Sequence, residues 1–593
     1  MKNIIILLCV LLSFTACKQD IKTPIEADIN PSEPFNSLLR DYHEESLKLY
    51  PVKATEAGDN RYNALLPNVL SPEFIANEKA FYNTYKSKVN AFGEDELSRE
   101  QRLSKAVLNW ECDINLDRLN YKKYTPIDQM WSFNLDFGRF ASGASTQPFN
   151  TVEDYKNWLQ RVDGFLNWMQ SAEANMREGI ATGHVLPKSL VVKVLPQLEV
   201  LTTTQLEDHL FYQPILNLPD SFSDEDKNNL TEAYKIMILD KIVPAYTQLY
   251  NFVSTDYLEA ARKSSGISEV PNGSEYYDHQ IKLYTTTTMT ADEIHQLGLK
   301  EVARILSEME KVKAQVGFKG DIISFFDYVR NNKDLMPFTE PQEVIDNFIK
   351  IHDKMQPQIN KLFDLKPRTA FEVRRTEAFR EASSSAEYIQ GTIDGSRPGV
   401  FYVPIPDAAT YNIFSDESLF LHEAIPGHHF QISLQQENKD LPEFRKTLWY
   451  SAYGEGWALY TESLGEELGL YTDPYQYFGM LSAEMHRAIR LVVDTGIHTK
   501  GWSREKAIKY SLQNEAESEE SITREIERYM ANPGQALSYK IGQLKIRELR
   551  AKAEKELGVN FNIAQFHNQV LESGCIPLAL LETKIDNWIA ANQ

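Results

Sequence analysis

TADEIHQLGLKEVARILSEMEK, residues 290–311, has the pattern of an amphipathic helix along its whole length. Thr290 and Glu293 form a capping box, in which each side chain accepts a hydrogen bond from the main-chain amide of the other residue. Val302, Ile305 and Met309 follow at the spacing that places apolar side chains on one helix face. Runs of the same kind cover about 75–120, 151–178, 224–263, 341–362, 479–495, 504–516 and 539–556. The sequence therefore predicts a mainly α fold.

Strand signals are few, and the clearest ones lie together. Residues 386–393 and 400–404 alternate apolar and polar side chains on either side of a Gly- and Pro-containing segment, 394–399. We expect these runs to form a hairpin or a pair of neighbouring strands in a small sheet. Gly, Ser and Pro also interrupt the helical pattern at 265–276, where we predict a soft boundary between two lobes.

Composition excludes several classes of protein. The 593 residues are 42% hydrophobic and 25% charged, which is ordinary for a soluble globular protein and excludes collagen-like, coiled-coil and multi-span membrane proteins. The 62 basic and 84 acidic residues give a net charge of −22. Phosphate contacts need a basic surface, so free nucleic-acid binding is not expected. An acidic balance also repels anionic ligands and attracts cations.

The first residues resemble an export signal. Lys2 precedes an apolar run, 4–12, that is too short to span a membrane. Small residues then precede Cys17, as in bacterial lipoproteins, where this cysteine is lipidated and becomes the first mature residue. We predict a signal peptide at 1–16, a lipid anchor and tether at 17–35, a helical domain at 36–593 and a location in the bacterial cell envelope. The alternative is an ordinary cleaved signal with a chance cysteine.

The motif that indicates chemistry is His-Glu-Ala-Ile-Pro-Gly-His-His, residues 422–429. Ser415, a typical N-cap residue followed by two acids, begins a helix that carries His422 and Glu423. Two histidines and a glutamate that face one cavity are the usual construction of zinc hydrolases. In such sites the glutamate beside the first histidine moves a proton from the attacking water to the leaving amine. The bland alternative is a buried cluster of polar side chains without an ion.

The sequence identifies the second and third metal ligands less directly than the first. In an unbroken helix His429 would lie on the face of His422 but about 10.5 Å along the axis, and His428 would point away. Because Pro426 and Gly427 break or bulge the helix, either histidine is a candidate. Glu455 precedes an apolar helical run and would complete a His/His/Glu set. Glu462, two turns further on, is a candidate to orient a ligand histidine.

These motifs together resemble the bacterial domain-of-unknown-function family 885, grouped with the gluzincin-type zinc metallopeptidases. Residues 422–428 match the family pattern His-Glu-x-x-Pro-Gly-His, and residues 455–458 match its Glu-Gly-Trp-Ala stretch. Further matching stretches are 397–402, 494–498, 501–502 and 533–542. The resemblance implies a large helical metallopeptidase-type fold with an active-site cleft and one zinc ion. It also implies that His428 rather than His429 is the second ligand and that Glu455 is the third.

The resemblance suggests two further roles. Gluzincin-like sites often have an edge strand before the zinc-binding helix that hydrogen-bonds the peptide backbone, and residues 399–404 are similarly placed. The oxyanion that develops during peptide hydrolysis needs a hydrogen-bond donor, for which Tyr539 and His498 are candidates. Ordinary packing or hydrogen bonding is an equally good interpretation of both residues.

The sequence thus predicts a lipid-anchored zinc metallopeptidase that hydrolyses oligopeptides, with Glu423 as general base and then general acid. Nitrogen and oxygen ligands bind several divalent ions, so zinc rests on the resemblance. Two rival functions remain: a glycan- or nutrient-binding lipoprotein without catalysis, and a metal-binding pseudoenzyme. The sequence favours neither exo- nor endo-cleavage.

Overall fold

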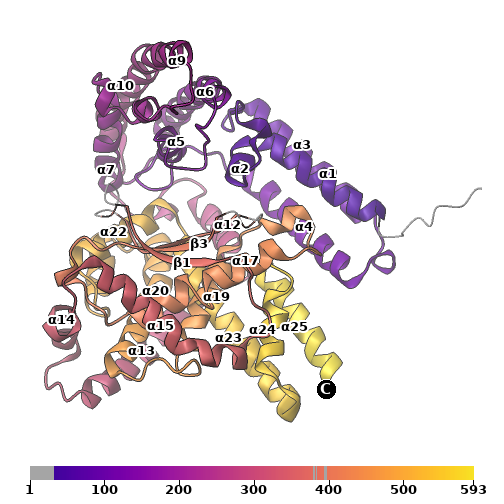
Figure 1. The fold of residues 1–593 in the computed structure, drawn as a ribbon, viewed down its shortest axis with the longest axis vertical. Coiled ribbons are helices and arrows are strands. Elements are labelled where there is room, and N and C mark those ends of the chain that lie inside the picture. The colour runs from indigo at the N-terminus through magenta and orange to yellow at the C-terminus, as the bar shows by residue number, and fades with distance from the viewer. Residues whose placement is uncertain (1–32, 378–380, 382–383, 393–394, 396) are drawn as a thin grey trace, which may run out of the picture.

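The computed structural model describes residues 33–377, 381, 384–392, 395 and 397–593, and these form a mainly helical protein with one small sheet (Figure 1). The predicted signal peptide, Cys17 and most of the predicted tether lie outside the described residues. Among the described helices, none is long and apolar enough to cross a membrane.

The elements follow one another in this order. The first half contains α1 Glu33–Leu49, α2 Pro51–Glu56, α3 Pro72–Asn90, α4 Arg99–Arg118, α5 Phe133–Ala141, α6 Val152–Thr182, α7 Lys188–Glu199, α8 Gln213–Leu216, α9 Asp224–Ile236, α10 Val243–Phe252, α11 Leu258–Ala260 and α12 Gly273–Thr285. The second half contains α13 Ala291–Gln315, α14 Ile322–Asn331, α15 Pro341–Leu362, β1 Phe371–Arg375, β2 Glu387–Ile389, β3 Gly399–Val403, α16 Asp416–Glu423, α17 His428–Glu437, α18 Glu443–Lys446, α19 Ser451–Glu462, α20 Pro474–Thr499, α21 Arg504–Leu512, α22 Glu519–Ala531, α23 Ser538–Leu557, α24 Ile563–Leu571 and α25 Leu578–Asn592.

The helix that begins after Thr290 confirms the sequence pattern. The Thr290 amide donates to Glu293 Oε2 at 2.8 Å, and the Glu293 amide donates to Thr290 Oγ1 at 3.3 Å. Val302, Ile305 and Met309 are all buried. The capping box and the apolar face of α13 are therefore where the sequence places them.

The sheet is larger than the sequence predicts, and its order corrects one prediction. β2 pairs with β3 in antiparallel fashion, as expected, but β1 also pairs with β3, in parallel from Phe371↔Gly399 to Arg375↔Val403. The order β1-β3-β2 makes β3 the central strand. The prediction of an edge strand at 399–404 is therefore wrong, since both sides of this strand are paired. The edges of the described sheet are β1 and β2.

The sheet lies across the middle of the molecule in Figure 1, with α5, α6, α7, α9 and α10 above it and α13, α15, α20 and α23 below it. Phe348 of α15 packs edge-on against Phe401 of β3, with ring centroids 5.1 Å apart. The segment 265–276 precedes the lower group of helices. Its Gly266 lies directly against the main chain of α20 at Ile497. The boundary between two lobes stays a prediction.

A buried ion cluster fixes three helices of the lower part. The Nζ of Lys540, on α23, is fully buried and lies 2.6 Å from Glu484 on α20 and 3.1 Å from Glu301 on α13. Arg304 joins the same cluster, 2.7 Å from Glu484. Because an unpaired charge there would be very costly, the four groups hold these helices in one arrangement.

Helices α19 and α23 cross at two glycines, which gives a first testable prediction. A Cβ on Gly542 would lie 1.8 Å from the Ala452 carbonyl oxygen and 2.7 Å from the Cα of Gly456. We expect Gly542→Ala to push these main chains apart and to lower the free energy of unfolding by about 1–3 kcal/mol, measured by chemical denaturation. Gly93→Ala is the matched control, because its new Cβ would meet only the flexible Glu96 side chain, at 3.6 Å. Equal stability of the two variants would contradict this packing.

Candidate metal centre

The motif at 422–429 forms two helices separated by a tight break. α16 ends at Glu423 and α17 begins at His428, so Pro426 and Gly427 interrupt the helix as the sequence predicts. A Cβ on Gly427 would lie 1.9 Å from the His422 carbonyl oxygen, so only glycine allows this close return of the chain. The break thus turns the start of α17 back toward the end of α16. Ser415 occupies the N-cap position of α16, although its side chain makes no capping hydrogen bond.

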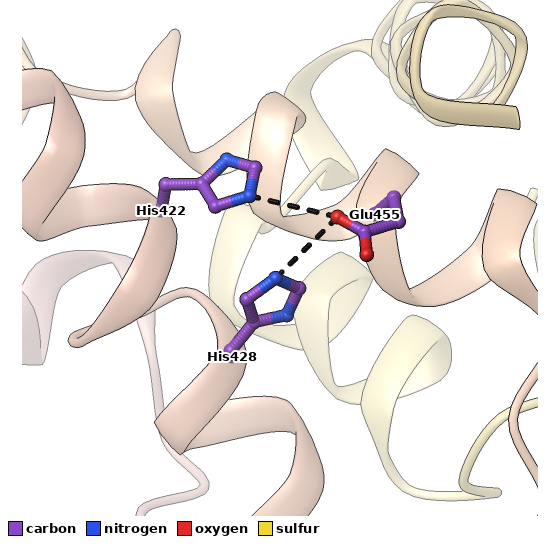
Figure 2. Close-up of side chains that lie close together, drawn as sticks. All are labelled: His422, His428 and Glu455. Atoms are coloured by element: carbon purple, nitrogen blue, oxygen red, sulfur yellow. Dashed lines mark ion pairs between the residues drawn. The ribbon is translucent and has the colours of Figure 1, made fainter. Parts of the chain in front are cut away.

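This return brings two imidazoles to one carboxylate. His422 Nε2 lies 3.6 Å from Glu455 Oε2, and His428 Nε2 lies 3.5 Å from the same oxygen. Figure 2 shows both rings pointing at Glu455, which is the fifth residue of α19. One ligand atom from each of the three residues lies within 4.8 Å of the others.

These separations fit a single divalent ion. Two ligands at about 2.1 Å from a tetrahedral zinc ion lie about 3.4 Å apart, close to the two distances observed here. Two imidazoles, one carboxylate and an open fourth position are also a donor set of catalytic zinc sites. The residues present therefore fit a zinc ion in both chemistry and spacing.

Helix α19 donates two side-chain hydrogen bonds to the main chain around residues 421–426. Trp457 Nε1, two residues after Glu455, donates to the Pro426 carbonyl at 2.9 Å. Thr461 Oγ1 donates to the Leu421 carbonyl at 2.8 Å. Both bonds are buried, so they fix the position of Glu455 relative to the break between α16 and α17.

Glu462 supports His422 from behind, where the sequence places an orienting carboxylate. His422 Nδ1 and Glu462 Oε1 are 2.7 Å apart, and Ser418 Oγ donates to Glu462 Oε2 at 2.6 Å. A carboxylate accepts from Nδ1–H, so in the neutral ring this contact places the lone pair on Nε2, the nitrogen that faces Glu455. His428 Nδ1 has no such partner among the described residues.

The support from Glu462 gives a second prediction. We expect Glu462→Gln to weaken zinc affinity about 10- to 100-fold, because the neutral amide no longer raises the basicity of His422. Competitive titration against a chromophoric chelator measures this affinity. Glu466→Gln, four residues further on and exposed, is the matched control and should bind zinc like the wild type. An unchanged affinity in Glu462→Gln would show that this carboxylate serves packing only.

The charges of the site influence one another strongly. Burial alone would lower the pKa of His422, but the carboxylates of Glu455 and Glu462 outweigh it and raise this pKa to about 9. Burial would raise the pKa of Glu455, but His428 and His422 hold it well below its usual range. Glu423 differs from Glu455, because burial dominates there and raises its pKa. A raised pKa suits a group that accepts and returns a proton.

His429, the alternative second ligand, faces away from this set. Its Nδ1 lies 2.9 Å from the Tyr388 hydroxyl, and its ring packs against Phe371 with centroids 5.0 Å apart. Burial lowers its pKa to about 4. His429 therefore joins α17 to the sheet, and His428 is the histidine that accompanies His422 and Glu455.

The two predicted oxyanion donors lie in different environments. Tyr539 lines the same cavity as His422, Glu423, His428 and Glu455, a space of about 700 Å³. His498 does not line it. Its side chain is fully buried, its Nδ1 accepts from the Ile267 amide at 3.0 Å, and its Nε2 lies 3.0 Å from the Tyr529 carbonyl. With both nitrogens bound to main chain, His498 has no free group for a substrate, and the prediction for this residue is wrong.

One wall of this cavity carries three arginines that no sequence motif indicates. Arg487 and Arg490 come from α20 and Arg528 comes from α22, and all three line the cavity with the His/His/Glu set. The spacing of Arg487 and Arg490, one turn apart, indicates a shared helix face. No local pattern connects that face to α22 or to residues 422–428.

This chain is similar in sequence to one protein family and in structure to two solved proteins. The model of a family described as "Bacterial protein of unknown function (DUF885)" matches residues 51–585. The chain belongs to the DUF885 family. Among curated proteins this DUF885 chain has no match.

Two solved structures share the fold of this DUF885 protein. The crystal structure of a "putative lipoprotein" from Colwellia psychrerythraea is 28% identical, covers 95% of this chain and 99% of its own, and superposes with a TM-score of 0.86. A "putative lipoprotein of unknown function" from Shewanella oneidensis is 19% identical, covers 93% of this chain and 99% of its own, and gives a TM-score of 0.74. The helical fold of this DUF885 protein is thus shared over nearly the whole length of both relatives.

Proposed function

We propose that this DUF885 protein is a zinc-dependent peptide hydrolase. The observation that supports this most directly is the convergence of His422, His428 and Glu455 within 4.8 Å, beside a glutamate, in a large cavity. When bound, a zinc ion would supply Lewis-acid polarisation of water and of the substrate carbonyl. The three residues would hold the ion, and the neighbouring side chains would position the substrate and move protons.

Glu423 is the proton carrier of this proposal. It is the residue next to His422, its side chain lines the cavity, and burial raises its pKa. Its carboxylate would accept a proton from the attacking water and donate it to the amine that leaves when the peptide bond breaks. Arg487 lies close enough to act on the charge of Glu423.

Tyr539 is the proposed donor to the oxyanion. Arg528 Nη2 donates to the Tyr539 hydroxyl oxygen at 3.3 Å, which occupies one lone pair and leaves the hydroxyl hydrogen free to point into the cavity. A preorganised O–H donor at this place would stabilise the charge that develops on the carbonyl oxygen.

The peptide backbone would lie along β2 rather than β3. Glu387 and Tyr388 of this edge strand line the cavity, and so do the flanking residues Ser385, Ala386 and Gln390. An edge strand offers main-chain donors and acceptors to an extended peptide. The strand beside the catalytic cavity is thus the one that the sheet order leaves at its edge.

We further propose that the protein is anchored in the cell envelope through a lipid on Cys17. The sequence of the first 17 residues supports this, and so do the descriptions of the two structural relatives as lipoproteins.

A peptide-library cleavage screen, run with and without a strong chelator, tests the proposed reaction. We expect cleavage that the chelator abolishes and that added zinc restores. Zinc binding without cleavage of any peptide would indicate the pseudoenzyme, and a metal-free protein that binds glycans would indicate the nutrient-binding lipoprotein.

A further inference from the structure

The wall of the cavity formed by α20 and α22 is cationic in a protein of strongly negative net charge. Arg487, Arg490 and Arg528 all line the cavity that contains His422, His428 and Glu455. A net charge of −22 repels anions over most of the surface. Three guanidinium groups therefore lie together on one wall of a cavity whose lining also contains carboxylates.

Two of these arginines are held firmly but keep unused donors. Arg490 donates to the Tyr529 hydroxyl at 3.1 Å and to Glu525 at 2.8 Å, and its guanidinium lies 4.5 Å from the Tyr539 ring centre. Arg528 donates to the side chains of Gln535 and Tyr539. Even so, Nη1 of Arg490 and Nε of Arg528 are buried without a hydrogen-bond partner among the described residues. Arg490 is only 4% exposed, which makes its unused donor costly.

Arg487 has no carboxylate partner at all within the described part of the chain. Its one hydrogen bond is from Nη1 to the Ala483 carbonyl on its own helix, at a long 3.3 Å, and its Nε is unpartnered. Such a guanidinium beside a cavity has its planar fork of donors available to a ligand.

The acids of this wall do not neutralise it. Glu515 lies 2.5 Å from His486, and Glu525 lies near His486, Arg490 and Arg528 at once. Glu517 also lines the cavity, and burial raises its pKa. Glu525 therefore pairs with two guanidiniums, Arg490 and Arg528. Arg487 has no such ion pair among the described residues and interacts with Glu423 and Glu517 only at longer range.

We propose that Arg487, together with the unpartnered donors of Arg490 and Arg528, binds the C-terminal carboxylate of the peptide substrate. The inference rests on the proposed peptide hydrolysis, and it makes the protein a peptidase that cuts near the C-terminal end. A guanidinium binds a carboxylate through two parallel, charge-assisted hydrogen bonds, and this is the strongest polar contact available to a peptide end. The same cavity then contains both the anchor for that end and the His/His/Glu set.

Calorimetric binding to zinc-loaded Glu423→Gln protein tests the inference without turnover. The probes are one peptide made as the free acid, the same peptide as the C-terminal amide, and an amide that carries a glutamate side chain near its end. We expect the free acid to bind at least tenfold more tightly than either amide. When Arg487→Gln is added to the Glu423→Gln protein, the free acid and the plain amide should bind within about twofold of each other.

Two further variants separate a binding role from a folding role. Arg524→Gln removes the same charge from α22 at an exposed position and should keep the full preference for the free acid. Arg487→Lys keeps the positive charge but not the fork of donors, so it should keep part of the preference. Thermal melts show whether each variant is folded, and Arg490→Gln offers an independent loss of the preference.

Different results would contradict the C-terminal carboxylate site and the proposed peptide hydrolysis. Equal affinity of the acid and the amide, or a preference for the glutamate-bearing amide, would overturn the C-terminal assignment. If the free acid is preferred but the wild-type protein cleaves no peptide, the anion site stands and the proposed hydrolysis fails. If the wild type cleaves acid and amide equally well, the hydrolysis stands and the inference fails.

Discussion

The Glu423→Gln variant is expected to keep one zinc ion per chain and to lose about 10²- to 10⁴-fold in kcat on any peptide that the wild type cleaves. The amide has nearly the same size as the carboxylate and is not one of the three metal donors. It accepts no proton from the attacking water, however, and has none to give to the leaving amine. Steady-state kinetics together with the metal content of the purified protein measure both parts of the expectation.

Glu417→Gln would be a poor comparison for this variant, because Glu417 is buried and bonded to Lys354. Glu466→Gln is a better one, since that carboxylate is exposed, and its kinetics should match the wild type. A Glu423→Gln protein that hydrolyses peptides at the normal rate would remove Glu423 from the proposed chemistry.

Loss of a single imidazole should be as severe. His422→Ala is expected to purify without zinc and to have no activity above background, even when excess zinc is added, because one of the three proposed protein donors is gone. The wild type, stripped by a chelator, should regain its activity on titration with one equivalent of zinc. Metal analysis and the reactivation curve measure the two results.

His429 supplies the matched control for this experiment. It is the neighbour of His428 but bonds to Tyr388 and packs on the sheet. His429→Asn should therefore keep its zinc, with circular dichroism to verify its fold. If His429→Asn lost the metal and His422→Ala kept it, the ligand set would have to be redrawn.

The helices could be predicted because their signals are local. The capping box at Thr290 and the apolar face of α13 need only a few consecutive residues. The break at Pro426 and Gly427 is equally local, since proline and glycine act on their own main chain. The motifs alone leave His428 and His429 open as the second ligand, and the resemblance to the family favours His428. Bonds from α19 to Leu421 and Pro426 help to hold Glu455 beside His422 and His428.

The features that the sequence does not predict depend on contacts between segments that are far apart in the chain. The sequence does not predict strand β1, because Phe-Glu-Val-Arg-Arg is short and mostly charged. It is a strand only because β3 lies beside it. Without β1, the segment that forms β3 has a strand partner on one side only, so the sequence predicts it as an edge strand. His498 lies in a stretch that matches the family, yet whether its ring faces the cavity or the main chain at Ile267 depends on how two segments pack. The arginine wall is similarly assembled from two helices.

The proposed reaction requires one divalent ion bound between His422, His428 and Glu455. Anomalous diffraction from crystals of the purified protein, with data collected above and below the zinc absorption edge, locates such an ion directly. The account predicts a single strong peak about 2.0–2.2 Å from His422 Nε2, His428 Nε2 and a Glu455 oxygen. No peak among these three residues in zinc-saturated crystals, or a peak at another cluster of side chains, would contradict it.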